Sequence, residues 1–216
     1  ADGPTVVDIA WLRIKAGERV VLLGGNGAGK SSLLRLLSGF GDPSAGRILL
    51  DGLSLSAIDP ADRRRAIGFL PQDVALLHGP LRENLNLSGA ALGEEEMFEA
   101  LDAVGLGAFV RAHPLGLDLP IQGSGSFSGG QRQAVGLARI ILQDPQIVLL
   151  DEPTAAFDQG SETHVINFLR QWLGSRTLIA TTHKRSLLDL AERAMVLRNG
   201  RVIMDGPLDE VVRGNQ

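Results

Sequence analysis

A glycine-rich loop at residues 24–31 constrains the fold of this chain more than any other feature. The loop reads Gly-Gly-Asn-Gly-Ala-Gly-Lys-Ser, and it follows an apolar run over residues 19–24 that is typical of a buried strand. Residues 31–37 continue with leucines at helical spacing. We therefore expect a strand, a loop and a helix in succession, with the loop amides and the positive end of the helix directed at one point.

Lys30 and Ser31 complete the P-loop pattern, and a strand before it and a helix after it are the context in which that pattern binds a nucleotide. Lys30 would reach the β- and γ-phosphates, and Ser31 would ligate Mg²⁺. A chance glycine turn before a helix is the alternative. The expected phosphate-binding residues are Gly24, Gly25, Asn26, Gly27, Ala28, Gly29, Lys30, Ser31 and Ser32.

Two acids follow another apolar run. Residues 147–150 read Ile-Val-Leu-Leu and precede Asp151 and Glu152, so a buried parallel strand would deliver both carboxylates to its carboxyl end. We expect Asp151 to hold Mg²⁺, directly or through a water, and Glu152 to polarise an attacking water. Many strands end in an acid, so this motif gains its meaning from the P-loop upstream.

A second glycine loop lies about a hundred residues after the first. Residues 126–131 read Ser-Phe-Ser-Gly-Gly-Gln and precede apolar residues at helical spacing. A helix N-terminus with exposed amides and a serine hydroxyl can bind phosphate. A flexible Ser-Gly linker is the alternative.

Strand-like and helical segments alternate at both ends of the chain. The strand-like segments are residues 19–24, 46–51, 53–56, 66–70, 146–150 and 177–181, with a hairpin at Asn199-Gly200. Residues 81–143 show helical periodicity without a convincing strand. This order predicts an α/β fold, namely a P-loop NTPase core with a mostly parallel sheet, a small antiparallel β portion and an inserted α-helical subdomain. We expect one domain over residues 1–216, with a core lobe at about 1–72 and 146–216 and a helical lobe at about 73–145.

The composition is that of a globular protein, with 44% hydrophobic residues, 21% charged residues and a net charge of −4. The acidic balance argues against nucleic acid as a partner. The absence of cysteine excludes disulfides and thiolate metal sites. No apolar run reaches the roughly 20 residues of a membrane span, so we expect any membrane domain to be absent from this chain.

The P-loop, the loop Ser128-Gly129-Gly130-Gln131 and the Asp-Glu-Pro-Thr segment at 151–154 resemble, in this order, the nucleotide-binding domain of the ABC ATPase family. The resemblance covers essentially the whole chain. It implies ATP and Mg²⁺ as ligands and a second nucleotide-binding domain, in a homodimer, arranged head to tail. The loop at 128–131 of one domain then closes over ATP held by the P-loop of the other, which explains why one chain carries two glycine loops.

Three further residues match motifs of that family. Gln72 resembles the Q-loop glutamine, which senses Mg²⁺ and the γ-phosphate, although a glutamine after a strand is ordinarily solvated surface. Asp158 resembles the D-loop aspartate that couples the two sites, and Ala155 stands where that loop usually has a serine. His183 follows an expected strand and resembles the switch histidine at the γ-phosphate, although a lone histidine is more often structural. The resemblance assigns catalysis to Glu152, His183 and Lys30, and the metal to Ser31, Gln72 and Asp151.

Several segments favour an exporter. Residues 81–85 resemble a segment of exporters, and residues 116–125 resemble the X-loop that contacts the transmembrane domains. Gln122 stands where exporters usually have a glutamate, which brings coupling through that carboxylate into question. The sequence of residues 68–73 and 196–202 resembles the corresponding sequences in the ATPases of type I secretion systems. This resemblance implies the motor domain of a bacterial half-transporter that exports proteins, at the cytoplasmic face of the inner membrane.

Other positions depart from the family pattern. The chain has no tyrosine, the residue on which family members usually stack adenine. Trp11 lies in an expected strand at residues 8–14 and is interpreted as a core residue rather than an adenine platform, so the stacking residue is expected upstream of Ala1. Phe127 replaces a usual leucine and should preserve the signature loop. The arginine run at 63–65 is interpreted as a solvated helix face, with contact to a partner domain as the alternative.

Two other functions stay open at this point. A soluble ABC ATPase is one, although the DNA-maintenance type carries a long coiled coil between its two loops and the translation type has two domains in one chain. A module that binds ATP only to dimerise is the other. Gln122 and Ala155 leave room for the binding module, whereas the intact catalytic and metal-binding residues favour an enzyme.

Overall fold

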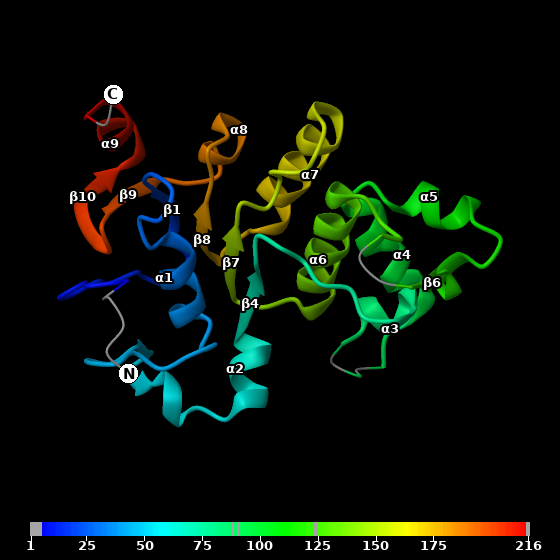
Figure 1. The fold of residues 1–216 in the computed structure, drawn as a ribbon, viewed down its shortest axis with the longest axis horizontal. Helices are drawn as coiled ribbons and strands as arrows, with labels where there is room; N and C mark the ends of the chain where they lie inside the picture. Colours follow the sequence, from blue (N-terminus) through cyan, green and yellow to red (C-terminus); the bar gives the residue numbers. More distant parts are fainter. Residues whose placement is uncertain (1–5, 88, 90, 123–124, 215–216) are drawn as a thin grey trace. The chain divides into compact units, whose positions relative to one another are not determined.

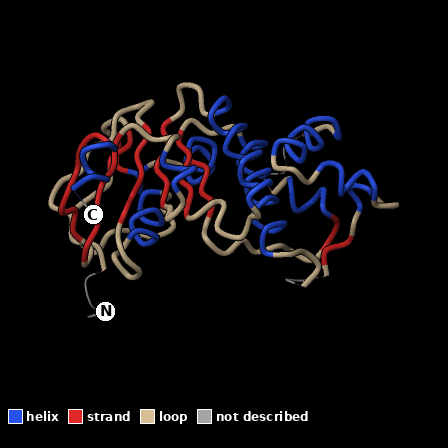
Figure 2. The backbone as a smooth tube through the Cα atoms, turned by 90° about the horizontal axis from the view of Figure 1, so that it is seen from above, coloured by secondary structure: helices blue, strands red, loops and turns tan. Residues whose placement is uncertain are grey.

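The computed structural model describes residues 6–87, 89, 91–122 and 125–214. Two compact units divide the chain. The core unit comprises residues 1–69, 145–152 and 175–216, and the helical unit comprises residues 70–144 and 153–174. Figure 2 shows the strands concentrated in the core unit, whereas helices make up most of the helical unit.

A six-stranded sheet with the order β10-β9-β1-β8-β7-β4 forms the centre of the core unit (Figure 1). β1 pairs in parallel with β8 and β9, β7 pairs in parallel with β8, and β10 pairs antiparallel with β9. This arrangement confirms the α/β fold with a mostly parallel sheet. The strands are β1 (Arg19–Leu23), β4 (Ile67–Leu70), β7 (Ile147–Asp151), β8 (Thr177–Thr181), β9 (Arg193–Arg198) and β10 (Arg201–Pro207).

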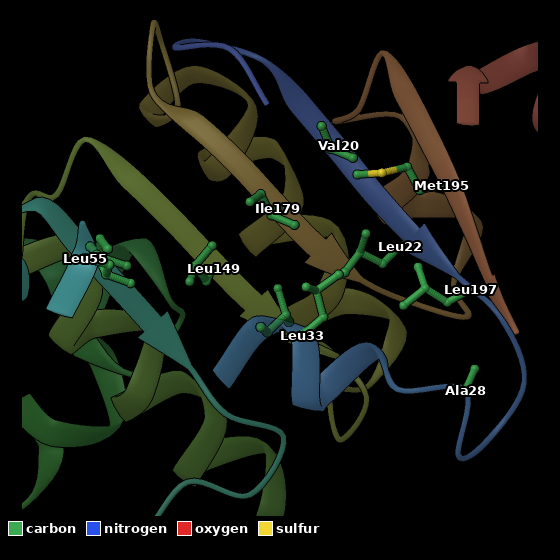
Figure 3. Close-up of a cluster of buried hydrophobic side chains, with 11 residues drawn as sticks. Val20, Leu22, Ala28, Leu33, Leu55, Leu149, Ile179, Met195 and Leu197 are labelled. Carbon is green, nitrogen blue, oxygen red and sulfur yellow. The ribbon is translucent and has the colours of Figure 1, made fainter. Parts of the chain in front are cut away.

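The parallel strands are continuous apolar runs because both faces of the sheet are covered. The central residues of β1 and β7 are buried. On one face, Leu33 of α1 (Lys30–Leu37) lies close to Leu22 and Leu149 in a cluster of buried side chains (Figure 3). Burying a leucine stabilises the fold by about 1.5–3 kcal/mol. The cluster therefore holds α1, and with it the glycine loop, against the sheet.

Local signals determine the turns and helix starts of the core unit. Asn199 and Gly200 have φ angles of 49° and 76°, as the two-residue hairpin between β9 and β10 requires. Asp59 caps α2 (Pro60–Ala66) by accepting a hydrogen bond of 2.7 Å from the Ala61 amide. The other elements of this unit are β2 (Leu49–Leu50), β3 (Leu53–Ser54), a 3₁₀ turn (Leu55–Ala57), α8 (Arg185–Leu188) and α9 (Leu208–Gly214).

α6 is the central helix of the helical unit. It packs against α3 and α4, and α4 also contacts α5 and α7. Three glutamates open α4, where the positive end of the helix favours them. Residues 153–174, which we expected in the core lobe, cluster with this unit. The helices are α3 (Leu81–Leu85), α4 (Glu94–Ala103), α5 (Gly107–Ala112), α6 (Gly129–Gln143) and α7 (Gln159–Trp172), with a 3₁₀ turn at Gly116–Asp118.

Two expectations about strands are wrong. β6 (Pro120–Ile121) lies inside the stretch that showed no strand pattern and pairs with β5 (Gly79–Pro80), which lies just before that stretch. Two-residue strands at prolines have no periodicity to detect. Residues 8–14 form no strand, and Trp11 is 77% exposed instead of buried. Ile9 and Leu12 pack on the core, and their three-residue spacing leaves Trp11 on the outside.

No helix within the described residues is long and apolar enough to cross a membrane.

We expect Leu149→Ala to lower the free energy of unfolding by about 2–5 kcal/mol, because Leu149 is fully buried and its truncation leaves a cavity beneath α1. Leu49→Ala is the matched control at a position that is 50% exposed, and it should change that free energy by about 0.5 kcal/mol or less. Urea titration followed by circular dichroism measures both. Equal effects would show that the cluster around Leu149 is not the cooperative core.

Candidate functional site

The glycine loop follows a backbone path that requires glycine at two positions. Gly24 has a φ of 144°, and a side-chain carbon there would collide with the carbonyl oxygen of Leu197. Gly29 has a φ of 99° and directly precedes α1. Residues 25–27 are exposed. The loop therefore presents backbone amides at the N-terminus of α1, which is the arrangement that phosphate groups bind.

Lys30 is the first residue of α1 and is 8% exposed. Its Nζ donates hydrogen bonds to the carbonyl oxygens of Gly24 at 2.7 Å and Gly25 at 3.1 Å. Both acceptors are neutral, so they position the ammonium without cancelling its charge. Ser31 and Ser32 follow in the first turn of α1, and both are partly exposed.

Asp151 ends β7 beside Thr181, its register partner at the end of β8. Asp151 is buried, and its Oδ1 accepts a hydrogen bond of 2.6 Å from the Thr181 hydroxyl. The same hydroxyl oxygen accepts a hydrogen bond of 3.0 Å from the Glu152 amide. Thr181 therefore fixes one carboxylate oxygen of Asp151, namely Oδ1. Sequence reasoning missed this role of Thr181, and its position at a strand end beside His183 is the signal that could have revealed it.

Glu152 and His183 meet where β7 and β8 end, with 3.2 Å between Oε1 of Glu152 and Nε2 of His183. The side chain of Glu152 is 22% exposed and that of His183 is 54% exposed. Glu152 has a φ of 49°, a left-handed conformation that is uncommon outside glycine and concentrates at functional sites. The structure thus brings together a carboxylate and an imidazole that the sequence predicted to act in one reaction.

A cleft of about 550 Å³ adjoins the glycine loop. Residues 23–28 line it on the loop side, and Thr182, His183, Leu188 and residues 196–199 line the remainder. Clefts that bind small molecules have volumes of roughly 300–1,000 Å³. The core unit therefore offers a space for a small ligand in contact with both the loop and His183.

Among the described residues, no three acidic or histidine side chains converge as a preformed metal site. Mg²⁺ does not require one, because it keeps several waters and binds one or two carboxylates together with substrate phosphates. Oδ2 of Asp151 and the hydroxyl of Ser31 are oxygen ligands of the required kind, and their elements α1 and β7 are in contact. The core unit fits Mg²⁺ on this chemistry.

The second glycine loop begins α6 in the helical unit. The Ser128 hydroxyl oxygen accepts a hydrogen bond of 3.2 Å from the Gln131 amide, and Oε1 of Gln131 accepts one of 2.8 Å from the Ser128 amide. This capping box makes the segment an ordered helix start, so the flexible-linker alternative is wrong. Both side chains keep hydrogens to donate, because each uses an oxygen in the box.

The segment before Asp158 packs against this helix start. Gln133 is buried, and its Oε1 accepts a hydrogen bond of 3.0 Å from the Ala156 amide. A side-chain carbon at Gly130 would lie 2.8 Å from the Ala156 carbonyl oxygen. The segment before Asp158 and the start of α6 are therefore packed against each other within the helical unit. Sequence reasoning missed Gln133, because a glutamine inside an amphipathic helix carries no signal of its own.

Asp158 caps α7. Its Oδ1 accepts a hydrogen bond of 2.9 Å from the Ser161 amide, and its Oδ2 accepts one of 2.8 Å from the Ser161 hydroxyl. These hydrogen bonds, the one from the amide foremost, lower the pKa of the Asp158 carboxyl. Gln72 is exposed, two residues after β4. The roles of Gln72, Asp158 and residues 128–131 toward a ligand held by the core unit stay predictions.

Positions that depart from the family pattern are accommodated in different ways. Phe127 is buried against Phe109, with ring centroids 6.1 Å apart. Ala155 and Gln122 are exposed, and residues 123–124 of the expected X-loop lie outside the described residues.

The arginine run at 63–65 is divided. Arg64 and Arg65 are exposed on α2, and Arg65 pairs with Asp62 at 2.9 Å. Arg63 is partly buried and donates a hydrogen bond of 3.4 Å to the Leu55 carbonyl oxygen. A solvated helix face therefore describes two of the three arginines.

We expect Thr181→Val to lower the free energy of unfolding by about 1–3 kcal/mol, because it removes the hydrogen-bond partner of the buried Asp151 carboxylate without changing the size of the side chain. Thr163→Val removes an exposed hydroxyl that bonds its own helix and is the control. Chemical denaturation compares the two variants. An unchanged stability of Thr181→Val would mean that the Asp151 carboxylate finds its stabilisation elsewhere.

Comparison with known proteins finds similarity to ABC transporters. The family model described as ABC transporter matches residues 7–155. The ATP-dependent lipid A-core flippase of Neisseria gonorrhoeae is 40% identical over 216 residues, which cover 100% of this chain and 35% of the flippase. The leukotoxin translocation ATP-binding protein LktB of a Pasteurella haemolytica-like species is 35% identical over 216 residues, which cover 99% of this chain and 30% of that protein. The structure of a bacterial Atm1-family ABC exporter with ATP bound matches with a TM-score of 0.86 and 31% identity, over 93% of this chain and 35% of that chain.

The chain spans about a third of the length of these relatives. The family model covers more than half of the chain, and residues 7–155 include the glycine loop, the start of α6 and the acidic end of β7. Nucleotide binding is implied by this match. The chain belongs to the ABC transporter family.

Proposed function

We propose that this chain hydrolyses ATP with Mg²⁺ as the motor domain of an ABC exporter. The pair formed by Glu152 and His183 carries the proposal. A carboxylate base lies 3.2 Å from an imidazole, and His183 also lines the cleft that adjoins the glycine loop. A module that bound ATP only to dimerise would need the loop but not this pair.

Binding would be the task of the loop and its surroundings. The amides of residues 25–29, the positive end of α1 and the Lys30 ammonium would hold the β- and γ-phosphates. Ser31, Asp151 through Oδ2 and Gln72 of the helical unit would hold Mg²⁺. When bound, Mg²⁺ neutralises the charge that develops on the phosphate oxygens.

Glu152 would act as the general base. Its partly shielded carboxylate would orient the attacking water and take up a proton from it. His183 would contact the γ-phosphate and hold the base in place through their 3.2 Å contact. Thr181 would steady both acids, because its hydroxyl bonds the Asp151 carboxylate and the Glu152 amide.

A second chain would complete each site. The Ser128 hydroxyl and the amides of residues 129–131 would close over the γ-phosphate held by the loop of the partner chain. The capping box supports this assignment, because it keeps the start of α6 ordered with donors to spare. Asp158 would connect the two sites, since its segment packs on the same helix start through Ala156 and Gln133.

The chain would work at the cytoplasmic face of a bacterial inner membrane, joined to transmembrane domains. The relatives support this placement, since they are about three times as long and carry the names flippase, translocation ATP-binding protein and exporter. We propose protein export of the type I secretion kind, for which LktB is the supporting relative. Export of a lipid conjugate is the second candidate, because the flippase is 40% identical.

Glu152→Gln should reduce ATP turnover by about 100-fold or more, because an amide cannot act as the general base. The same variant should accumulate as a dimer in the presence of ATP, because the closed state no longer resets. Phosphate release and gel filtration with and without ATP measure the two effects.

Glu99→Gln is the matched control on the exposed face of α4, and it should behave as the unsubstituted chain. Wild-type turnover by Glu152→Gln would contradict the role of Glu152. No turnover by the unsubstituted chain at any protein concentration, combined with an ATP-dependent dimer, would favour the binding-only module.

Lys30→Ala in the host bacterium should distinguish the two kinds of cargo, because it removes the phosphate contact while leaving the rest of the protein in place. Protein export predicts that a polypeptide disappears from the culture medium. Lipid export predicts that lipid A-core accumulates in the inner membrane. A host that shows neither change would contradict the exporter proposal and favour a soluble ABC ATPase.

A further inference from the structure

Arg139 of α6 binds three oxygens of neutral groups on the segment that follows Gln72. Its Nε donates to the Asn84 carbonyl oxygen at 2.6 Å, its Nη1 to the Ala75 carbonyl oxygen at 3.0 Å, and its Nη2 to Oδ1 of Asn84 at 3.0 Å. Burial lowers the pKa of the guanidinium. Partial burial of the Arg139 cation carries a desolvation penalty, and none of these three partners is a carboxylate that would offset it. Charge pairing with these partners therefore does not explain why an arginine stands at this position.

Asn84 extends the network into the backbone. It is 1% exposed. Its Oδ1 accepts a hydrogen bond of 2.8 Å from the Leu77 amide, and its Nδ2 donates to the carbonyl oxygens of Leu77 at 2.9 Å and Pro80 at 3.3 Å. Arg139 and Asn84 together therefore hold residues 75–80 at four backbone atoms.

Residues 75–80 lie in the sequence between two parts of the proposed site, Gln72 and the loop at 128–131. It begins three residues after Gln72, and Val74 packs against α6 so closely that a side-chain carbon at Gly136 would come within 2.8 Å of it. α6 starts at the Ser128 cap, about 16 Å from Arg139 along the helix at 1.5 Å per residue. All of these residues belong to the helical unit.

We propose that Arg139 and Asn84 are positioning residues that fasten the Gln72 segment to α6, so that Gln72 and the loop at 128–131 move as one body. This inference rests on the proposed function, in which Gln72 contacts the ATP bound by its own chain and the loop at 128–131 contacts the ATP bound by the partner chain. An apolar residue at 139 would fill space but leave the oxygens of Ala75 and Asn84 without this donor. The three hydrogen bonds come from three different nitrogens of the guanidinium, whereas a lysine donates from a single nitrogen.

Arg139→Met and Arg139→Lys test the proposal in the full chain, with Arg170→Met on the exposed face of α7 as control. Turnover at saturating ATP should fall at least tenfold in Arg139→Met at a temperature where circular dichroism shows it folded, and Arg139→Lys should recover part of it. The dissociation constant of a fluorescent ATP analogue should stay within twofold, because the glycine loop lies in the other unit.

Hydrogen exchange separates positioning from a merely structural role. In the Glu152→Gln background, ATP should protect the amides of residues 75–78 and 129–131 together. Adding Arg139→Met should keep the protection at 129–131 and lose it at 75–78. If Arg139→Met does not fold, Arg139→Lys takes its place in the same comparison.

The outcomes distinguish the proposed function from the proposed role of Arg139. An unsubstituted chain without ATP-dependent turnover or dimer formation overturns the proposed function. An active chain in which the Arg139 variants keep full turnover, or lose it only in proportion to their unfolded fraction with both segments still protected together, overturns the inference and leaves the function in place.

Discussion

The parallel register of β1, β8 and β7 is the constraint on which the site depends. Leu22 of β1 and Asp151 of β7 are both register partners of Thr181 in β8. These three residues lie side by side across the strands: Leu22 is followed within two residues by the glycine loop, Thr181 is buried, and Asp151 is the acid. Parallel strands share a carboxyl edge, so groups far apart in sequence meet there without long loops. The Thr181 hydroxyl also links β8 to the end of β7 by hydrogen bonds, because it donates to Asp151 and accepts from the Glu152 amide.

The core unit holds opposite charges near the loop without pairing them with each other. Lys30 bonds neutral carbonyl oxygens, and Asp151 bonds a neutral hydroxyl. An ion pair between these two residues would cancel both charges, and a ligand would have to break it in a poorly solvated place. Neutral partners hold each charge in position and leave it free to act on phosphate or on a cation. Preorganised charge of this kind needs little rearrangement when the ligand arrives.

Local signals predicted most of the core unit, because β1, β4 and β7 are apolar runs that end at a glycine, a proline and an acid respectively. The hairpin at Asn199-Gly200 depends on neighbouring residues alone and was equally readable. Roles that depend on distant partners left no such signal. Thr181 bonds a residue 30 positions away, and Arg139 bonds one 55 positions away. Trp11 was misplaced because a break in the apolar spacing, rather than its size, decides which side chain faces out. The predicted ligand contacts come from the resemblance of motifs to those of a known family. The fold shows only where the residues of these motifs lie.

In the helical unit, the same atoms serve folding and proposed recognition. Ser128 and Gln131 close the start of α6, and Asp158 closes the start of α7. A capped loop has lost its conformational freedom during folding, so a partner chain does not have to order it again. The stability of two helices is therefore linked to the shape of the proposed interface, and a change at a cap would alter both together. Arg139 lies about three turns further along α6. It bonds Ala75 and Asn84 and does not touch the cap, so substitutions there test the proposed link to the Gln72 segment without changing the cap itself.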